Sequence, residues 1–426
     1  MNNKSDYKKK AVELHKKLKG KISVCSKATV SKNNLNLLYT PGVAEPCKII
    51  QRNEDKSYEL TSRANMIAVI TDGSAVLGLG NIGNIAGMPV MEGKCILFKA
   101  FAGVDAFPLC INTQNVNKIV ETICMLEPSF GGINLEDISA PRCFEIERKL
   151  KEKMSIPVFH DDQHGTAVVV LAGLINVLRL TNRTVEHTKV VVNGAGAAGL
   201  AVTKFLLSYG FKNIIICDRN GILPKKFSFR MNEEKFITAR KTNPLNVKGT
   251  LTDALKDADV FIGLSVKNVL KAGMLKKMNK DAIVFALANP DPEIKHGIAK
   301  KCGIKYIATG RSDFPNQINN VLAFPGIMRG ALAVRAKDIN EEMKIAASIA
   351  IAAMIPEKKL RADYFIPNAD DLSIGPKVAG AVTYAAIKTK VNRIKKDPAQ
   401  VEKETKAMIK AVSDCSSHLN AHCDTG

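Results

Sequence analysis

The chain has 426 residues, of which 46% are hydrophobic and 24% are charged. A chain of this length exceeds the usual size of a single hydrophobic core, so two packed domains are expected. The formal charge of +21 is spread as lysines through predicted surface helices, without a helix-turn-helix or an RNA-binding signature, which argues against nucleic acid as a partner. The apolar runs, such as 168–171, are shorter than the roughly 20 residues that a membrane helix needs, which argues against a membrane protein.

The N-terminal segment and the cysteines indicate where in the cell the protein is located. The N-terminus carries lysines and leads into an amphipathic stretch instead of an apolar core with a cleavage site, so a cytoplasmic protein is expected. Ten cysteines are scattered without a C-x-x-C pair. This pattern favours buried, reduced thiols over a zinc site or a disulfide framework.

The first 165 residues predict short elements separated by turns. In chain order we expect a helix ending near residue 21, a turn-rich segment at 39–46, a strand at 66–76 broken at 71–73, a glycine-dense segment at 78–93, a strand at 95–101, a helix at 115–125 and a strand at 131–140. The glycine-dense segment is too rich in glycine for a regular element and long for a connector. We therefore interpret it as a candidate binding loop.

A different pattern begins near residue 166, where helices and strands alternate. Helices are expected at 167–180, 200–209, 341–354 and 380–395, and strands at 189–192, 213–218, 259–265, 282–289 and 306–309. Such alternation is typical of a parallel sheet covered by helices on both faces. The predicted class is α/β: a Rossmann-type doubly wound parallel sheet plus an N-terminal α/β domain completed by C-terminal helices. The predicted domains are 1–165, 166–370 and 371–426, with the last segment packing on the first domain.

A dinucleotide-binding motif lies between the strand at 189–192 and the helix that follows it. Gly194, Gly196 and Gly199 have G-x-G-x-x-G spacing, with alanines at 195, 197 and 198 (Ala195, Ala197, Ala198). The first glycine permits a tight turn, the second lets the backbone approach a pyrophosphate, and the third allows close helix–strand packing. The alternative is a glycine turn that only packs two elements, but the strand, the helix and the acid Asp218 at the end of the next strand favour a cofactor site.

The choice between NAD and NADP depends on the residues around Asp218. A carboxylate there binds the ribose hydroxyls and disfavours a 2′-phosphate, whereas Arg219, Lys225 and Lys226 could each accept one. NAD is favoured on this ground.

Two pairs of acids stand where apolar runs stop. Glu136 and Asp137 form one pair, and Asp161 and Asp162 form the other. Four carboxylates brought together would repel one another unless a cation lay among them, and oxygen ligands of this kind suit Mg²⁺ or Mn²⁺. The alternative for the second pair is a role as helix N-cap acids.

Four further polar residues have simple structural explanations when each is taken alone. His160 and His164 could form another metal site, but without a cysteine partner they are better interpreted as satisfied polar residues. Lys94 is expected at the start of a strand, where partial burial and a nearby cation would lower its pKa toward that of a useful base. Its alternative is a lysine that extends from a strand end into solvent. Tyr39 alone is an amphipathic anchor beside a proline turn.

Taken together, these segments resemble the malic enzymes, and specifically their shorter, bacterial-type branch. The matching stretches are 39–46 (YTPGVAEP), 71–83 (TDGSAVLGLGNIG), 87–94 (GMPVMEGK), 135–138 (LEDI), 159–166 (FHDDQHGT), 288–290 (ANP) and 319–326 (NNVLAFPG). They run in the family's order over about residues 20–390, which is more specific than any single motif.

The resemblance implies a role for each candidate residue. It makes Tyr39 the general acid and Lys94 the general base, supported by Asp161. It makes three acids the ligands of Mg²⁺ or Mn²⁺, namely Glu136, Asp137 and Asp162. It places the substrate against two amides, Asn289 and Asn320, of which Asn289 also contacts the cofactor.

The implied reaction is the oxidative decarboxylation of L-malate to pyruvate and CO₂ with reduction of NAD or NADP, and oxaloacetate could also be decarboxylated. A homodimer is expected. The longer eukaryotic branch has an arginine for the substrate carboxylate where this chain has Ala75, so an amide or a backbone nest must hold that group. The alternatives are a malolactic-type enzyme that releases lactate and a non-catalytic dinucleotide-binding protein.

Overall fold

The first half of the chain builds a four-stranded parallel sheet. The computed structural model describes residues 3–76, 78–227 and 231–423. The strand order is β2-β1-β3-β4, and every neighbouring pair is parallel. The strands are β1 (Met66–Thr71), β2 (Asp105–Cys110), β3 (Gly132–Leu135) and β4 (Val158–His160). Their carboxyl ends therefore meet at one edge, where the acids that follow β3 and β4 also lie.

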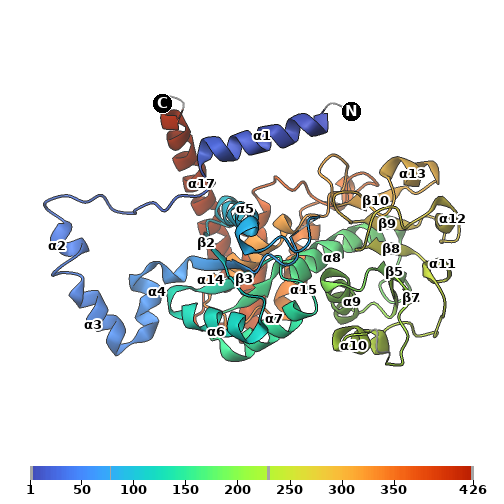
Figure 1. The fold of residues 1–426 in the computed structure, drawn as a ribbon, viewed down its shortest axis with the longest axis horizontal. Coiled ribbons are helices and arrows are strands. Elements are labelled where there is room, and N and C mark those ends of the chain that lie inside the picture. Colours follow the sequence, from blue (N-terminus) through green and yellow to red (C-terminus); the bar gives the residue numbers. More distant parts are fainter. Residues whose placement is uncertain (1–2, 77, 228–230, 424–426) are drawn as a thin grey trace.

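Seven helices accompany this sheet in the described part of the chain. They are α1 (Asn3–Leu18), α2 (Leu35–Leu38), α3 (Ala44–Arg52), α4 (Ser57–Leu60), α5 (Asn84–Ala102), α6 (Val116–Leu126) and α7 (Arg142–Lys153). One face of the sheet packs on α6 and α7 through an apolar cluster, and the other face packs on α5. Helices α2 and α3 stand apart from this body, at the left of Figure 1.

The prediction for the glycine-dense segment and the strand after it is wrong. Residues 84–102 form the single helix α5, although they include Gly87, Pro89 and Gly93. Buried Met91, Cys95, Phe98 and Ala102 recur at helical spacing, so one apolar stripe faces the sheet. Tertiary packing along this stripe outweighs the weak helix propensity of the glycines. Only the part before α5 remains a loop.

The second half builds a six-stranded sheet in the order β10-β9-β8-β5-β6-β7. The strands are β5 (Lys189–Asn193), β6 (Asn213–Asp218), β7 (Gly221–Ile222), β8 (Val260–Gly263), β9 (Ile283–Ala286) and β10 (Tyr306–Thr309). The predicted doubly wound parallel sheet is confirmed, with the addition of β7 as a short antiparallel edge. The strand order reverses between β5 and β8, and such a switch point is where open α/β sheets bind their ligands.

Ten helices belong to this half and to the C-terminal segment. They are α8 (Asp161–Thr181), α9 (Ala197–Tyr209), α10 (Glu233–Lys241), α11 (Leu251–Ala254), α12 (Ala272–Leu275), α13 (His296–Lys301), α14 (Phe324–Ala333), α15 (Glu341–Ala353), α16 (Ile374–Lys388) and α17 (Pro398–Cys423). Helices α8 and α9 cover one face of the sheet, and α11 to α13 contribute to the cluster on the other face.

Helix α8 joins the two halves. By length and composition it could cross a membrane. This segment was not singled out from the sequence, where only unbroken apolar runs were considered, because Gly173 and Asn176 interrupt it. In the structure 72% of its apolar window is buried, and it packs against α9 and α15. Burial in the protein core accounts for its apolar composition. The boundary predicted between residues 165 and 166 falls inside this helix.

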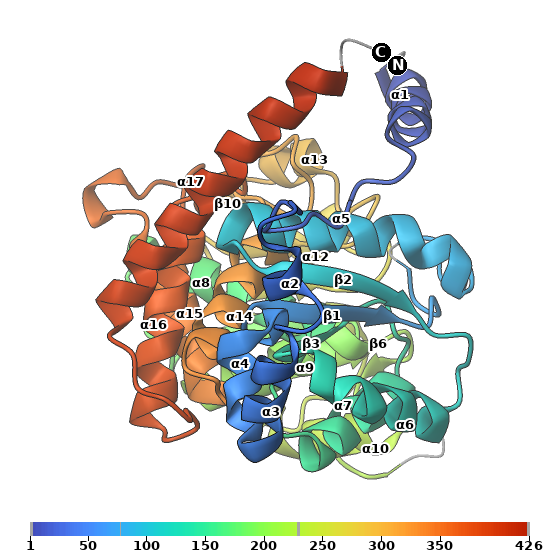
Figure 2. The ribbon, with the colours of Figure 1, turned by 90° about the vertical axis from the view of Figure 1, so that its left-hand side faces the viewer.

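The C-terminal helices pack back on α5. A Cβ atom on Gly375 of α16 would lie 1.9 Å from the carbonyl oxygen of Phe101, and one on Gly103 would lie 2.5 Å from Met408 of α17. These approaches are too close for any side chain, so both glycines are required by packing. Figure 2 shows α17 running along α16 and past α5. The segment after residue 370 thus completes the first half, as the predicted fold class states.

Candidate active site

A buried lysine lies between two carboxylates at the carboxyl edge of the first sheet. Lys94, on the buried face of α5, places its Nζ 2.5 Å from Asp161 Oδ2 and 2.8 Å from Glu136 Oε1. The side chains of Lys94, Asp161 and Glu136 are 8%, 0% and 5% exposed. The Nζ also lies 4.2 Å from the centre of the Phe324 ring. The structure thus brings together two residues that are 67 positions apart in the sequence.

The pKa of Lys94 shifts in the opposite direction to the one expected from the sequence. Burial alone lowers the pKa of this ammonium, but the negative charges of Asp161 and Glu136 outweigh burial and raise it. The expected lowering rested on burial and a neighbouring cation, and although the resemblance made Asp161 the support of Lys94, local pattern could not show that two acids contact its ammonium. The expected position of Lys94 at the start of a strand is also corrected, since it lies within a helix.

The three predicted metal ligands gather beside Lys94. Each of Glu136, Asp137 and Asp162 offers a ligand atom, and these atoms lie within 4.8 Å of one another. Burial, reinforced by Asp162 and Glu136, raises the pKa of Asp137 to about 8, and its Oδ2 has no hydrogen-bond partner among the described residues. Three oxygen donors that repel one another and leave a buried oxygen unpaired fit a divalent ion such as Mg²⁺ or Mn²⁺.

The backbone also shapes this cluster. The N–H of Asp137, a residue in the left-handed region at φ 54°, donates to Asp162 Oδ2 at 2.8 Å. The amide of Asn134 donates to Glu136 Oε2 at 3.0 Å. Asn134 was not singled out from the sequence, because it lies inside the strand β3, just before the motif that contains the acids. The N–H of Ala75 donates to the carbonyl oxygen of Asp137 at 2.9 Å, so the position that carries arginine in the other branch does lie beside the site.

The predicted substrate amides take different positions. The amide of Asn320 donates to Asp161 Oδ2, so Asn320 belongs to the Lys94 cluster. This approach depends on Gly165, where a Cβ would lie 1.9 Å from Asp161 Oδ1. Asn289 follows β9, and a Cβ on Gly78 of the glycine-rich loop would lie 4.0 Å from its carbonyl oxygen. Asn289 therefore lies where the second half meets the loop of the first.

Tyr39 is not brought to this cluster within one chain. Its side chain is 69% exposed, and it follows α2, which stands apart from the body in Figure 1. The sequence placed Tyr39 in a turn-rich segment and could not show where that segment lies relative to Lys94.

The glycine motif has the geometry that its spacing predicts. Gly194 has a φ of 123°, and a Cβ there would lie 2.2 Å from the carbonyl oxygen of Leu264, in the segment after β8. A Cβ on Gly199 would lie 1.6 Å from the carbonyl oxygen of Gly194, whereas one on Gly196 would meet nothing within 4 Å. The first and third glycines are thus required by the fold, and the second leaves open space for a pyrophosphate at the start of α9.

Asp218 ends β6 as predicted, but it already has a cationic partner. Lys235 of α10 places its Nζ 2.9 Å from Asp218 Oδ2, and the side chains are 19% and 13% exposed. Arg219 is exposed. Sequence reasoning considered Arg219, Lys225 and Lys226 and missed Lys235, which lies one helix further along the chain.

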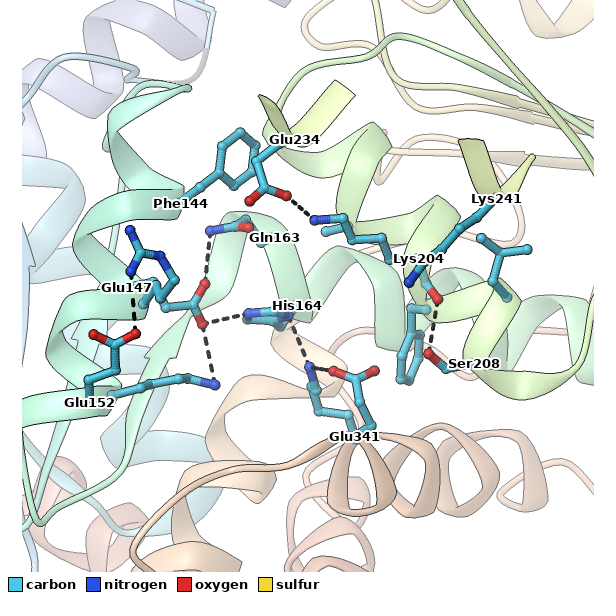
Figure 3. Close-up of a pocket in the computed structure, with 16 residues that line it drawn as sticks. Phe144, Glu147, Glu152, Gln163, His164, Lys204, Ser208, Glu234, Lys241 and Glu341 are labelled. Carbon is cyan, nitrogen blue, oxygen red and sulfur yellow. Dashed lines mark hydrogen bonds and ion pairs between the residues drawn. The ribbon is translucent and has the colours of Figure 1, made fainter. Parts of the chain in front are cut away.

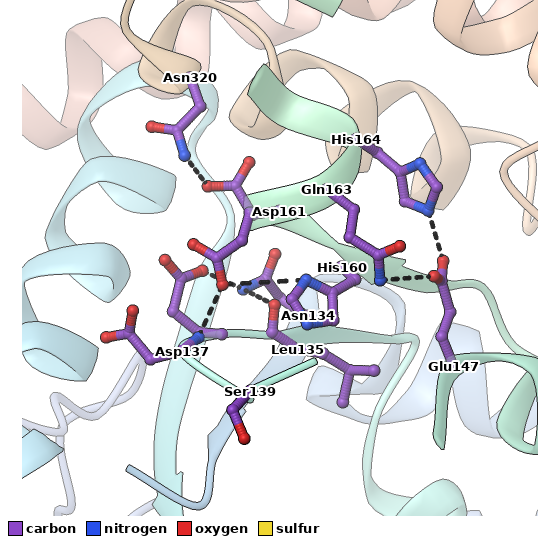
Figure 4. Close-up of polar contacts among 12 residues, drawn as sticks. Asn134, Leu135, Asp137, Ser139, Glu147, His160, Asp161, Gln163, His164 and Asn320 are labelled. Carbon is purple, nitrogen blue, oxygen red and sulfur yellow. Dashed lines mark hydrogen bonds and ion pairs between the residues drawn. The ribbon is translucent and has the colours of Figure 1, made fainter. Parts of the chain in front are cut away.

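The two histidines behave differently. His164 lies 2.6 Å from Glu147 Oε1 through Nε2 and 3.2 Å from Lys344 through Nδ1, which confirms it as a satisfied polar residue. Burial lowers its pKa to about 4. For His160 the interpretation is wrong, because neither of its ring nitrogens has a hydrogen-bond partner among the described residues. Figure 4 shows both rings and their surroundings.

A cavity lies next to His164 and does not include the Lys94 cluster. It has a volume of about 770 Å³ and is lined by α7, α9 and the start of α15, with Phe144 and Phe205 among charged side chains (Figure 3). Its lysines are largely paired with acids, as Lys204 is with Glu234. The catalytic candidates therefore form a tightly packed group that is separate from this cavity.

Comparisons with known proteins agree with the motifs. The model described as malic enzyme, N-terminal domain matches residues 19–118 and 113–151, and the model described as malic enzyme, NAD binding domain matches residues 163–387. A bifunctional malic/malolactic enzyme of Bacillus subtilis is 54% identical, covering 94% of this chain and 98% of the relative. An NAD-dependent malic enzyme of Geobacillus stearothermophilus is 53% identical, covering 88% and 78%.

A solved structure has the same architecture over the whole chain. The crystal structure of a malic enzyme from Pyrococcus horikoshii matches with a TM-score of 0.94 and 45% identity, covering 98% of this chain and 99% of that one. Other relatives are named NADP-dependent malic enzymes. With both family models matched and its acids, lysine and glycine motif assembled as described, this chain belongs to the malic enzyme family.

Proposed function

We propose that this chain oxidatively decarboxylates L-malate to pyruvate and CO₂ with reduction of NAD or NADP, and that it also decarboxylates oxaloacetate. The observation that carries the proposal is the buried Lys94, held between Asp161 and Glu136 beside the acid cluster. A basic group next to a cation site is what removal of a hydroxyl proton and loss of a carboxylate require.

Glu136, Asp137 and Asp162 are proposed to hold a divalent metal ion. When bound, the ion polarises the oxygen at C2 of the substrate and stabilises the negative charge that develops as CO₂ leaves. The acids supply three oxygen donors from two elements, the end of β3 and the first turn of α8. Glu136 also pairs with Lys94. When Glu136 binds the ion, its negative charge acts less strongly on Lys94, so the pKa of Lys94 is raised less.

Lys94 is proposed to take the proton from the C2 hydroxyl through Nζ while the hydride leaves for the nicotinamide. Asp161 orients the amine through the 2.5 Å contact of its Oδ2, and the amide of Asn320 donates to the same oxygen. Asn289 and Asn320 are proposed to bind malate, with Asn289 also facing the cofactor. The glycines and alanines at 194–199 and Asp218 are proposed to bind the dinucleotide through the pyrophosphate and the ribose.

Tyr39 is proposed to protonate C3 after decarboxylation, at the site of a second copy of the chain. In a single chain Tyr39 is exposed and apart from Lys94, and the arm around it carries other exposed apolar side chains. These are Val30, Leu35, Leu37, Leu38 and Ile49. An exposed apolar arm of this kind marks a protein–protein contact, and a homodimer with two-fold symmetry would deliver each arm to the partner.

A cytoplasmic location is also proposed. The described cysteines are free thiols, and Cys95, Cys143 and Cys217 are buried. Reduced cysteines are typical of proteins from reducing compartments.

The test is a steady-state assay of the purified chain with L-malate, Mn²⁺ and either NAD or NADP, followed by analysis of the products. Pyruvate, CO₂ and reduced cofactor in equal amounts are expected. Bound dinucleotide without turnover would instead support the non-catalytic alternative.

A second activity is suggested by the Bacillus subtilis relative, whose name includes a malolactic function. We propose that a malolactic reaction is the alternative outcome at the same site. Lactate formed from malate without accumulation of reduced cofactor would identify it.

A further inference from the structure

His160 is a fully buried residue whose ring makes no hydrogen bond to any residue that the structure describes. It ends β4, directly before Asp161 and Asp162, and is 0% exposed. Its register partner is Leu135, which belongs to the apolar cluster under α6 and α7. Leaving a buried polar group without a partner destabilises the fold. An apolar residue could fill this place without that cost, so the imidazole calls for an explanation.

One carboxylate close to the ring belongs to a candidate metal ligand. His160 Nδ1 lies 3.8 Å from Asp162 Oδ2, which is too long for a hydrogen bond. The ring is enclosed in the core, whereas the Asp162 side chain is 35% exposed. The carboxylate is therefore the group that can move, and a shift of about 1 Å would close the gap.

We propose that His160 is a positioning residue for the metal site, and that its Nδ1–H donates to Asp162 Oδ2 when this carboxylate binds a divalent ion. The inference rests on the proposed function, because it takes Asp162 as a ligand. Such a bond would fix the carboxylate in one orientation and leave Oδ1 for the ion. Outer partners of this kind typically change metal affinity by about 10- to 100-fold when they are removed.

The experiment measures Mn²⁺ binding to the full chain without malate or nucleotide, by following free Mn²⁺ with electron paramagnetic resonance. His160→Asn keeps a donor near the position of Nδ1, His160→Gln moves it to the position of Nε2, and His160→Leu removes it. We expect the Kd for Mn²⁺ to rise about 10- to 100-fold in the Leu and Gln variants and to stay within about threefold of the unaltered chain in the Asn variant.

The controls separate this inference from the proposed metal site. Asp162→Ala must weaken Mn²⁺ binding, and if it does not, the ligand assignment fails independently of His160. In the Asp162→Ala background, His160→Leu is expected to have no further effect, because the acceptor is gone. NAD affinity and thermal unfolding report whether each variant folds.

Three results would overturn the proposal. They are a His160→Leu variant that binds Mn²⁺ like the unaltered chain, a His160→Asn variant that binds Mn²⁺ as weakly as His160→Leu, and a further loss of Mn²⁺ affinity when His160→Leu is added to Asp162→Ala. If the Leu variant does not fold, the comparison of Asn with Gln decides, since both are polar and differ in where the amide lies.

Discussion

The charge on Lys94 is set by its neighbours. Two carboxylates hold its ammonium at 2.5 and 2.8 Å in a site that water barely reaches, so any change to one partner alters the others. The sequence predicted which residue types take part, because Lys94 and the acids lie in recognisable motifs. The family resemblance linked Asp161 to Lys94, whereas local pattern could not, since a contact over 67 positions depends on how α5 packs. The contact of Lys94 with Glu136 was not predicted, and Asn134 and Lys235 were missed.

Lys94→Ala is expected to lower kcat for malate oxidation by about 10²- to 10⁴-fold, the usual cost of losing a general base. Dinucleotide affinity should stay nearly unchanged, because Lys94 lies outside the glycine motif. The matched control is Lys99→Ala, on the same helix, whose side chain is 46% exposed and pairs with Asp105 at the surface. Turnover at the unaltered level in Lys94→Ala would remove this residue from the mechanism.

The cofactor preference is expected to favour NAD, because the Asp218 carboxylate is fixed at the end of β6 and repels a 2′-phosphate. Its pairing with Lys235 offers a cation to that phosphate if Asp218 is removed. Asp218→Ala should therefore lower kcat/KM for NAD relative to NADP by at least about tenfold, or 1.4 kcal/mol. Lys235→Ala should shift the ratio in the opposite direction. A tenfold preference of the unaltered chain for NADP would contradict this assignment.

At the scale of elements, the second half was predicted well and the first half less so. The β5–α9–β6 unit was recognised because its strand, glycine turn and helix are consecutive, and local pattern suffices for such a unit. Helix α5 was missed because Gly87, Pro89 and Gly93 argue against a helix. The apolar stripe of this helix packs on the first sheet, and that contact cannot be recognised from the local sequence. Strands β2, β4 and β7 were also missed. Strands β4 and β7 have three and two residues, and such short strands give weak periodic signals, whereas β2 contains Pro108, which argues against a strand.

Gly165→Ala tests how closely the first turns of α8 pack around Asp161 and Asn320. The added Cβ would lie 1.9 Å from Asp161 Oδ1 and 2.9 Å from Asn320 Cβ, so Asp161 must move away from Lys94. We expect a loss of stability of about 1–3 kcal/mol together with a fall in kcat. Gly297→Ala, in helix α13 with nothing within 4 Å of its Cβ, should be neutral or slightly stabilising. Equal unfolding midpoints for the two variants in denaturant would contradict the expected strain.

The acid cluster makes stability depend on pH when metal is absent. The folded-state pKa of Asp137 is raised from 3.8 to about 8, so the folded chain holds this proton more tightly than the unfolded chain. The resulting stabilisation is present below about pH 4 and is lost as the pH rises toward 8. With a chelator present, the Tm of the unaltered chain should fall as the pH rises from about 5 to about 8. The fall should be smaller in Asp137→Asn. Addition of Mn²⁺ should raise Tm more at about pH 8 than at about pH 5. A stabilisation by Mn²⁺ that is independent of pH would contradict this account.

At the scale of the whole molecule, the proposal that Tyr39 acts at the site of a second chain can be tested by mixing two variants. Neither Tyr39→Phe nor Lys94→Ala alone should be active. In a mixture refolded or exchanged at equal amounts, half of the dimers contain one of each, and one of their two sites then has both groups intact. About a quarter of the unaltered activity is therefore expected to return. If each chain used its own Tyr39, mixing would restore nothing.

Helix α8 carries Asp161 and Asp162, two acids of the candidate site, in its first turn and ends in the half with the dinucleotide-binding motif. A single apolar cluster, with this helix at its centre, extends from β1 to β9. The two halves therefore cannot be exchanged between proteins as independent modules, since a cut near residue 165 would divide the helix and strip one half of its acids. A change of dinucleotide preference is therefore expected to be reached by point changes around Asp218, which leave the acids of α8 in place.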